Sequence, residues 1–177
     1  MQRALARHDA LARSAVESHR GTIVKTTGDG MYAAFRDPVD ALLATIDLQQ
    51  SIADSSATDG VGLRLRCGLH AGVVEHRDND YFGRVLNRAS RIMTAAHGGQ
   101  VLLSQAVATL VSERLPADVE LRDLGVARLR DLANHEHLFQ LLHPQLRANF
   151  PALRTLEATT AVHVAAKTGA SVTLPGD

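Results

Sequence analysis

The chain has 177 residues, with 19 basic and 19 acidic side chains and one cysteine, and 45% of its residues are hydrophobic while only 3% are aromatic. This length suits one domain with a sizeable core and a tail. The zero net charge argues against electrostatic binding of nucleic acid, and the few aromatic rings argue against a base-stacking surface. The single cysteine excludes an internal disulfide framework. No apolar run reaches the roughly 18–20 residues that span a bilayer, so we expect a cytoplasmic protein with no membrane or nucleic-acid partner.

The beginning of the chain predicts a helix followed by a β-hairpin. Residues 4–19 repeat apolar side chains at helical spacing, which is typical of an amphipathic helix. Residues 22–24 and 31–35 are short β-like runs on either side of Gly28-Asp29-Gly30. Asp-Gly between two such runs is a strong hairpin signal, because the turn needs positive φ.

A second helix and a strand are predicted next. Asp37 can cap the helix, and Pro38 suits its first position. Residues 55–62 are small and polar, so we expect a loop there. Residues 63–74 begin with alternating apolar and polar side chains, which indicates a half-buried strand with Cys67 facing the core.

The second half of the chain continues the alternation of helices and strands. The predicted elements are a helix over 83–96, a strand over 101–103, a helix from a Ser104 cap to about 115, and strands over 120–125 and 138–142. Strands that alternate with helices but include a hairpin favour an α+β sandwich over a doubly wound parallel sheet. Because the periodicity fades after Pro144, we place the domain at 1–143 and a linker with a disordered tail at 144–177.

The segment Lys25-Thr26-Thr27-Gly28-Asp29-Gly30 is the first cluster that could carry chemistry. Asp29 would be an exposed carboxylate at a strand end, and its glycine neighbours would let a metal-bound phosphate approach. Mg²⁺ prefers one or two carboxylates together with substrate phosphates. The alternative is an ordinary tight hairpin with a surface lysine.

Two further clusters contain amide and guanidinium groups. Asn87 and Arg91 follow residues 80–83 and are four residues apart, so they share one helical face. Together they could hold a ribose and a phosphate, or they could be a solvated pair. Arg128 and Arg130 near a strand end could meet a triphosphate, or they could form an ordinary polar edge.

The histidines show no spacing typical of a metal site. His70 could be a ligand, but no second His or Cys lies at ligand spacing, so we interpret it as a hydrogen-bonded strand residue. His135 and His137 flank Glu136 in a predicted turn, and we expect both histidines to be exposed to solvent.

Taken together, these motifs resemble the catalytic domain of class III nucleotidyl cyclases, the adenylate and guanylate cyclases, over residues 3–143. The resemblance is strongest in the segments 21–35, 67–72, 80–91 and 97–104. It implies a ferredoxin-like, palm-type α+β sandwich with a mixed, mostly antiparallel sheet. It also implies a head-to-tail homodimer whose sites lie at the subunit interface.

The resemblance assigns Asp29 to one of the two aspartates that bind a pair of Mg²⁺ or Mn²⁺ ions. Lys25 and Asp80 match the pair that selects the purine, and a Lys/Asp pair is the type that selects adenine. Lysine can donate to the adenine N1, and aspartate can accept from the exocyclic amine. The implied substrate is therefore ATP.

The resemblance also assigns the residues nearest the reaction. Asn87 matches the residue that orients the ribose, and Arg91 matches the residue that stabilises the transition state. Arg130 lies where the family commonly has a lysine that contacts the terminal phosphates. The implied reaction converts ATP to 3′,5′-cyclic AMP and pyrophosphate by a two-metal mechanism.

One part of the family pattern has no counterpart in this sequence. In the family, a strand with the motif Phe-Thr-Asp-Ile/Met-Glu-Gly-Ser-Thr precedes the helix with which this chain begins, and it carries the other metal-binding aspartate. We therefore expect a cyclase-like domain that lacks its first strand and one metal ligand. The alternative is a catalytically inactive, cyclase-like regulatory or dimerisation module. Residues 146–157 resemble a linker that in some bacterial relatives leads to an ATPase and DNA-binding region.

Overall fold

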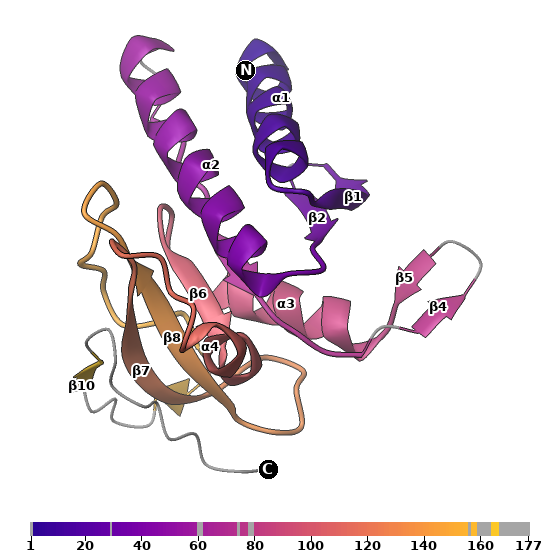
Figure 1. Ribbon diagram of the computed structural model, residues 1–177, viewed down its shortest axis with the longest axis vertical. Coiled ribbons are helices and arrows are strands. Elements are labelled where there is room, and N and C mark those ends of the chain that lie inside the picture. Colours follow the sequence, from indigo (N-terminus) through magenta and orange to yellow (C-terminus); the bar gives the residue numbers. More distant parts are fainter. Residues whose placement is uncertain are drawn as a thin grey trace.

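A computed structural model describes residues 2–28, 30–59, 62–73, 75–77, 80–155, 157–158 and 164–166. Its helices are α1 (Gln2–Ser18), α2 (Pro38–Asp59), α3 (Arg84–Ala95) and α4 (Gln105–Val111) (Figure 1). Its strands are β1 (Thr22–Thr27), β2 (Gly30–Ala34), β3 (Cys67–Leu69), β4 (Glu75–Arg77), β5 (Asp80–Phe82), β6 (Val101–Ser104), β7 (Glu120–Arg128), β8 (Glu136–Leu142), β9 (Glu157–Ala158) and β10 (Val164–Ala166).

The main sheet is mixed and mostly antiparallel, as predicted. Its strand order is β10-β7-β8-β6-β3, and β9 also pairs with β7. The β3–β6 pair is parallel, whereas β6–β8, β7–β8 and β7–β10 are antiparallel. The hairpins β1–β2 and β4–β5 each form a separate two-stranded sheet. This architecture confirms the α+β fold class.

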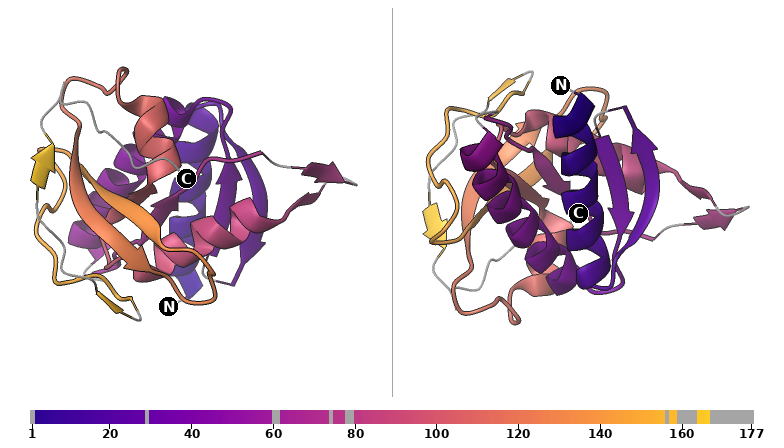
Figure 2. Two further views of the ribbon diagram at one scale, coloured as in Figure 1. Left: turned by 90° about the horizontal axis from the view of Figure 1, so that it is seen from below. Right: turned by 90° about the horizontal axis from the view of Figure 1, so that it is seen from above.

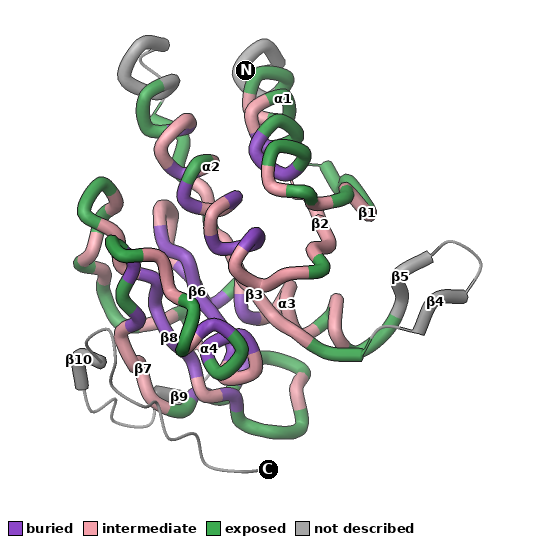
Figure 3. Tube along the Cα trace, in the orientation of Figure 1, coloured by how far each residue is buried: buried purple, intermediate pink, exposed green. Residues whose placement is uncertain are grey.

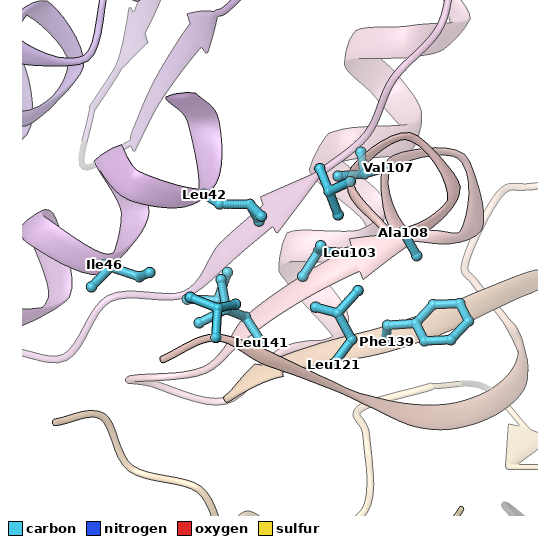
Figure 4. Close-up of a cluster of buried hydrophobic side chains, with 11 residues drawn as sticks. Leu42, Ile46, Leu103, Val107, Ala108, Leu121, Phe139 and Leu141 are labelled. Carbon is cyan, nitrogen blue, oxygen red and sulfur yellow. The ribbon is translucent and has the colours of Figure 1, made fainter. Parts of the chain in front are cut away.

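The two faces of the main sheet pack against different helices. On one face, Leu42 and Ile46 of α2 form one buried cluster with side chains of α4 and with Phe139 and Leu141 of β8 (Figure 4). On the other face, Ile92 of α3 packs with Leu138. Leu138 and Phe139 are neighbours on β8 and point to opposite faces, because side chains alternate along a strand. In Figure 3 the buried positions accordingly gather on β6, β8, α4 and part of α2.

Helix α1 lies beside α2, and the β1–β2 hairpin packs on the other side of α1 (Figures 1 and 2). Ala12, Ala15 and Val16 on α1 are buried. Arg20, just after α1, pairs with Asp40 in the first turn of α2. Burial of small apolar side chains and this ion pair together fix α1 against α2.

The boundaries of several elements differ from the prediction, and the largest differences concern α2 and β3. Residues 55–59, expected to be a loop, continue α2 to Asp59, since no glycine or proline interrupts the helix before Gly60. The strand expected over 63–74 is limited to Cys67–Leu69. Its partner β6 has only four residues, so few ladder hydrogen bonds are available to extend β3.

The segment after β8 packs on the domain as far as residue 155. The backbone N–H of Arg154 donates to the carbonyl of Ala95 at 3.0 Å. The carbonyl of Ala148 accepts hydrogen bonds from Arg122 and Gln140, each at 2.8 Å. These contacts hold the predicted linker against the sheet and α3. Within the last twenty residues of the predicted tail, Ala158 and β10 pair with β7, and the remainder lies outside the described residues.

No helix in the described ranges combines the length and the apolar character needed to span a membrane. Cys67 is partly buried and packs against the hydrophobic core, in agreement with its predicted inward orientation. Its thiol accepts a hydrogen bond from Gln49 at 3.5 Å, and burial raises the pKa of the thiol to about 12. A thiol with this pKa is protonated at neutral pH and is therefore a poor nucleophile.

Candidate functional site

Helix α3 positions the predicted amide and guanidinium groups. The helix begins after Gly83, whose φ of 124° favours glycine, and it extends over both Asn87 and Arg91. These two residues are one turn apart, and Asn87 is exposed while Arg91 is partly buried. Ile92 lies in the core beneath. The packing of α3 on the sheet thus leaves Asn87 accessible at its surface.

Arg91 has one ionic partner among the described residues. Its Nη2 lies 2.8 Å from Oδ2 of Asp131, and the arginine side chain is 30% exposed while that of Asp131 is 63% exposed. The Nε atom of Arg91 is buried and has no hydrogen-bond partner in the described part of the chain. The guanidinium is therefore oriented by one carboxylate and retains unused donors.

The loop between β7 and β8 is attached to α3 at both of its ends. At one end, Leu129 is buried against α3. At the other end, Glu136 is buried and its Oε2 lies 3.2 Å from Nε of Arg88. Arg130 is exposed in this loop and directly precedes Asp131, the partner of Arg91. The fold therefore places Asn87 and Arg91 on α3, and it places Arg130 in the loop that Asp131 joins to Arg91.

Lys25 lies on β1, and the antiparallel pairing of β1 with β2 confirms the predicted hairpin. Thr27 pairs with Gly30 across it. Lys25 is exposed on β1 and stands opposite Tyr32, next to a register shift. Asp29 lies outside the described residues. Its assignment as a metal ligand remains a prediction.

Asp80 begins β5, in the hairpin that stands away from the main sheet. Figure 2 shows the β4–β5 hairpin projecting from the body of the molecule in both views. Asp80 pairs in register with Arg77. Lys25 and Asp80 are thus on two different hairpins, neither of which belongs to the main sheet.

The histidine predictions have mixed outcomes. His70 follows β3 and its Nδ1 lies 2.9 Å from Oγ of Ser104, so the hydrogen-bonded interpretation is confirmed. Burial and the nearby charge of Arg88 lower the pKa of His70 to about 4, which keeps its ring neutral at pH 7. Within the described ranges, no three His, Cys, Asp or Glu residues could hold a metal ion together.

His137 is not exposed to solvent, and the prediction was wrong for this residue. Its Nε2 lies 2.6 Å from Oδ1 of Asp123, and its ring stacks on Phe139 with centroids 4.7 Å apart. His137 and Phe139 share one face of β8, because the strand begins at Glu136, two residues before its predicted start at 138. His135 is exposed, as predicted.

Asp131, Glu136 and Arg88 were not identified as site residues from the sequence. Their contacts join residues more than 35 positions apart, which the spacing of a single chain does not reveal. The φ of Asp131 is 59°, a conformation that Asp adopts more readily than most residues. The only indication of such a residue in the local sequence was an aspartate between two predicted strands.

The chain is similar to nucleotidyl cyclases in sequence. The family model described as the Adenylate and Guanylate cyclase catalytic domain matches residues 1–141. The uncharacterized protein Rv0891c of Mycobacterium tuberculosis is 42% identical over 161 residues, which are 90% of this chain and 54% of that protein. The putative adenylate cyclase 3 of Rhizobium meliloti is 29% identical over 149 residues, 83% of this chain and 25% of that protein. The chain therefore spans about half the length of the first of these relatives.

Solved structures share the fold. An adenylate cyclase of Trypanosoma brucei in its monomeric state matches with a TM-score of 0.73 at 25% identity, covering 89% of this chain and 86% of that one. The adenylate/guanylate cyclase/hydrolase of Silicibacter pomeroyi matches with a TM-score of 0.69 at 26% identity, covering 81% and 85%. The α+β sandwich expected from the resemblance is therefore observed.

Proposed function

Because the chain belongs to the family of adenylate and guanylate cyclase catalytic domains, we propose that it converts ATP to 3′,5′-cyclic AMP and pyrophosphate at a homodimer interface. The observation that carries this proposal is the arrangement on α3, where Asn87 and Arg91 lie one turn apart and an ion pair joins Arg91 to the loop that contains Arg130. An amide beside guanidinium groups suits a ligand that has both a ribose and a polyphosphate.

In the proposed reaction, the side chains on α3 act on the sugar and the reacting phosphate. Asn87 orients the ribose so that its 3′-hydroxyl faces the α-phosphorus. Arg91 donates to oxygens of the α-phosphoryl group, where negative charge develops as the bond to pyrophosphate breaks. Arg130 binds the terminal phosphates and offsets the charge of the leaving group.

The hairpin turn at Asp29 is the proposed metal site of this chain. Asp29 lies between two glycines, and a Cβ added at Gly28 would meet nothing within 4 Å in the described part of the chain. The open space at Gly28 supports the approach of a phosphate that carries Mg²⁺ or Mn²⁺, and a carboxylate is the donor that these ions prefer. When bound, these ions lower the pKa of the ribose 3′-hydroxyl and stabilise the phosphate charges.

The two remaining predicted residues act on the base in this proposal. Lys25 donates to N1 of adenine, and Asp80 accepts from the exocyclic amine. Both residues belong to hairpins outside the main sheet.

In the proposed dimer, Asp29 of one subunit acts with Lys25, Asp80, Asn87 and Arg91 of the other. A cytoplasmic location is part of the same proposal.

The proposal predicts that the purified chain forms cyclic AMP from ATP and Mn²⁺. The measurement is chromatographic separation of the nucleotides with mass detection. Asn87→Ala should lower kcat by about 10-fold to 100-fold, since the ribose loses its orienting contact. Thr94→Ala is the matched control, because Thr94 is an exposed residue of the same helix and its substitution should leave kcat unchanged.

Two outcomes would contradict parts of the proposal. Cyclic AMP formation that survives Asp29→Ala would exclude Asp29 as the metal ligand. A chain that dimerises but forms no cyclic nucleotide would instead support the alternative function, a regulatory or dimerisation module with the cyclase fold.

A further inference from the structure

Asp131 is the residue that orients the guanidinium of Arg91. Its Oδ2 lies 2.8 Å from Arg91 Nη2. A guanidinium has five N–H donors, and this contact engages only the Nη2 end. The Nε–H is buried and has no partner among the described residues. Donors are therefore left over for another anion, while the side chain is already held in one orientation.

The backbone conformation of Asp131, which places this carboxylate, has a cost in free energy. Asp131 has a φ of 59°, in the left-handed region that glycine adopts without strain; Asp adopts it more readily than most other residues, but at a cost relative to glycine. The turn is fixed by the buried side chain of Leu129 and by a hydrogen bond from the Leu132 N–H to the Leu129 carbonyl at 3.3 Å. A glycine would fit this turn better. Backbone strain of this kind is concentrated at functional sites, where the surrounding structure holds it in place.

We propose that Asp131 is a positioning residue for the cyclase reaction, an inference that rests on the proposed function. Its carboxylate holds the Arg91 guanidinium so that the remaining donors meet the α-phosphoryl oxygens of the nucleotide. An arginine side chain has several rotatable bonds and would otherwise sample many orientations. Asp131 thus contributes by preorganising Arg91 and does not itself contact the substrate.

Asp131→Gly tests this role without damaging the fold. The substitution removes the carboxylate and also relieves the positive-φ strain, so the melting temperature should not fall. We expect kcat to fall about 10-fold, because misorientation of a group that acts in the transition state lowers kcat, and we expect KM for ATP to stay within about 2-fold. Asp131→Asn keeps an acceptor oxygen and should be intermediate. Asp118→Asn, which removes an exposed carboxylate elsewhere, is the charge-matched control.

A second readout does not depend on catalysis. In protein labelled with ¹⁵N-arginine, the Nε–H resonance of Arg91, assigned with Arg91→Lys, should shift and exchange faster in Asp131→Gly. If the wild-type chain forms no cyclic AMP but this resonance responds, the proposed function fails while the pairing stands. An unchanged resonance would overturn the positioning role. So would a kcat equal to the wild-type value, or a lower KM for ATP, which would mean that Asp131 competes with the phosphates.

Discussion

Arg91→Ala is expected to lower kcat for cyclic AMP formation by about 10²-fold to 10³-fold, because a charged donor to the transferring phosphoryl group is lost. The effect on stability should be small. Arg91 is partly exposed, and its ion pair with Asp131 lies at the surface, where such pairs contribute less than about 1 kcal/mol. Steady-state kinetics with ATP and Mn²⁺, together with a thermal unfolding curve, separate the two effects.

Arg114→Ala is the matched control for this substitution. Arg114 also pairs with a carboxylate, that of Asp37, through two hydrogen bonds of 2.6 and 3.3 Å, and it lies after α4 rather than on α3. It should lose a similar surface interaction without a change in kcat. An Arg91→Ala variant that keeps more than a third of the wild-type kcat would remove Arg91 from the transition state.

Gly68→Ala is expected to destabilise the domain by about 2–4 kcal/mol, through overpacking between β3 and α3. A Cβ at Gly68 would lie 2.4 Å from the backbone nitrogen of Met93 and 2.7 Å from the carbonyl oxygen of Ala89. Both are backbone atoms of α3, so the helix itself must move. Since Asn87 and Arg91 belong to this helix, kcat should fall together with stability.

Gly62→Ala provides the control, because a Cβ at Gly62 meets nothing within 4 Å in the described part of the chain. Urea denaturation of both variants gives the difference in the free energy of unfolding. A Gly68→Ala variant within about 0.5 kcal/mol of the wild type, the range of ordinary surface substitutions, would show that α3 does not pack on β3 this closely.

The starts of helices and the hairpin could be predicted because local chemistry determines them. Asp37 accepts a hydrogen bond from the Val39 N–H at 2.9 Å, and Ser104 accepts one from the Val107 N–H at 3.4 Å, as expected of capping residues. The predicted hairpin likewise pairs β1 with β2, with Thr27 opposite Gly30. Each of these features involves residues fewer than four positions apart.

Element lengths and long-range pairs could not be predicted in the same way. The extent of β3 depends on β6, which follows it by more than thirty residues. The Arg91–Asp131 and His137–Asp123 pairs depend on the register of β7, β8 and the packing of α3. These are consequences of tertiary structure, and alternation or helical spacing contains no information on them.

In the candidate site, too, only the features that local spacing determines could be predicted from the sequence alone. A spacing of four residues is enough to place Asn87 and Arg91 on one side of a helix. Their proposed ligand, in contrast, follows from the family resemblance. The side chains of Asp29 and Asp80 lie outside the described residues, so their roles remain predictions.

The claim that two copies of this chain share one nucleotide site is tested most directly by mixing two variants. Asp29→Ala removes the predicted metal ligand and Arg91→Ala removes the phosphoryl contact, so each variant alone should form almost no cyclic AMP. After subunit exchange, half of the dimers are mixed and each has one intact site of two, so the mixture should recover about a quarter of the wild-type rate. A mixture that stays inactive, although mixed dimers are recovered through two different tags, would contradict the account.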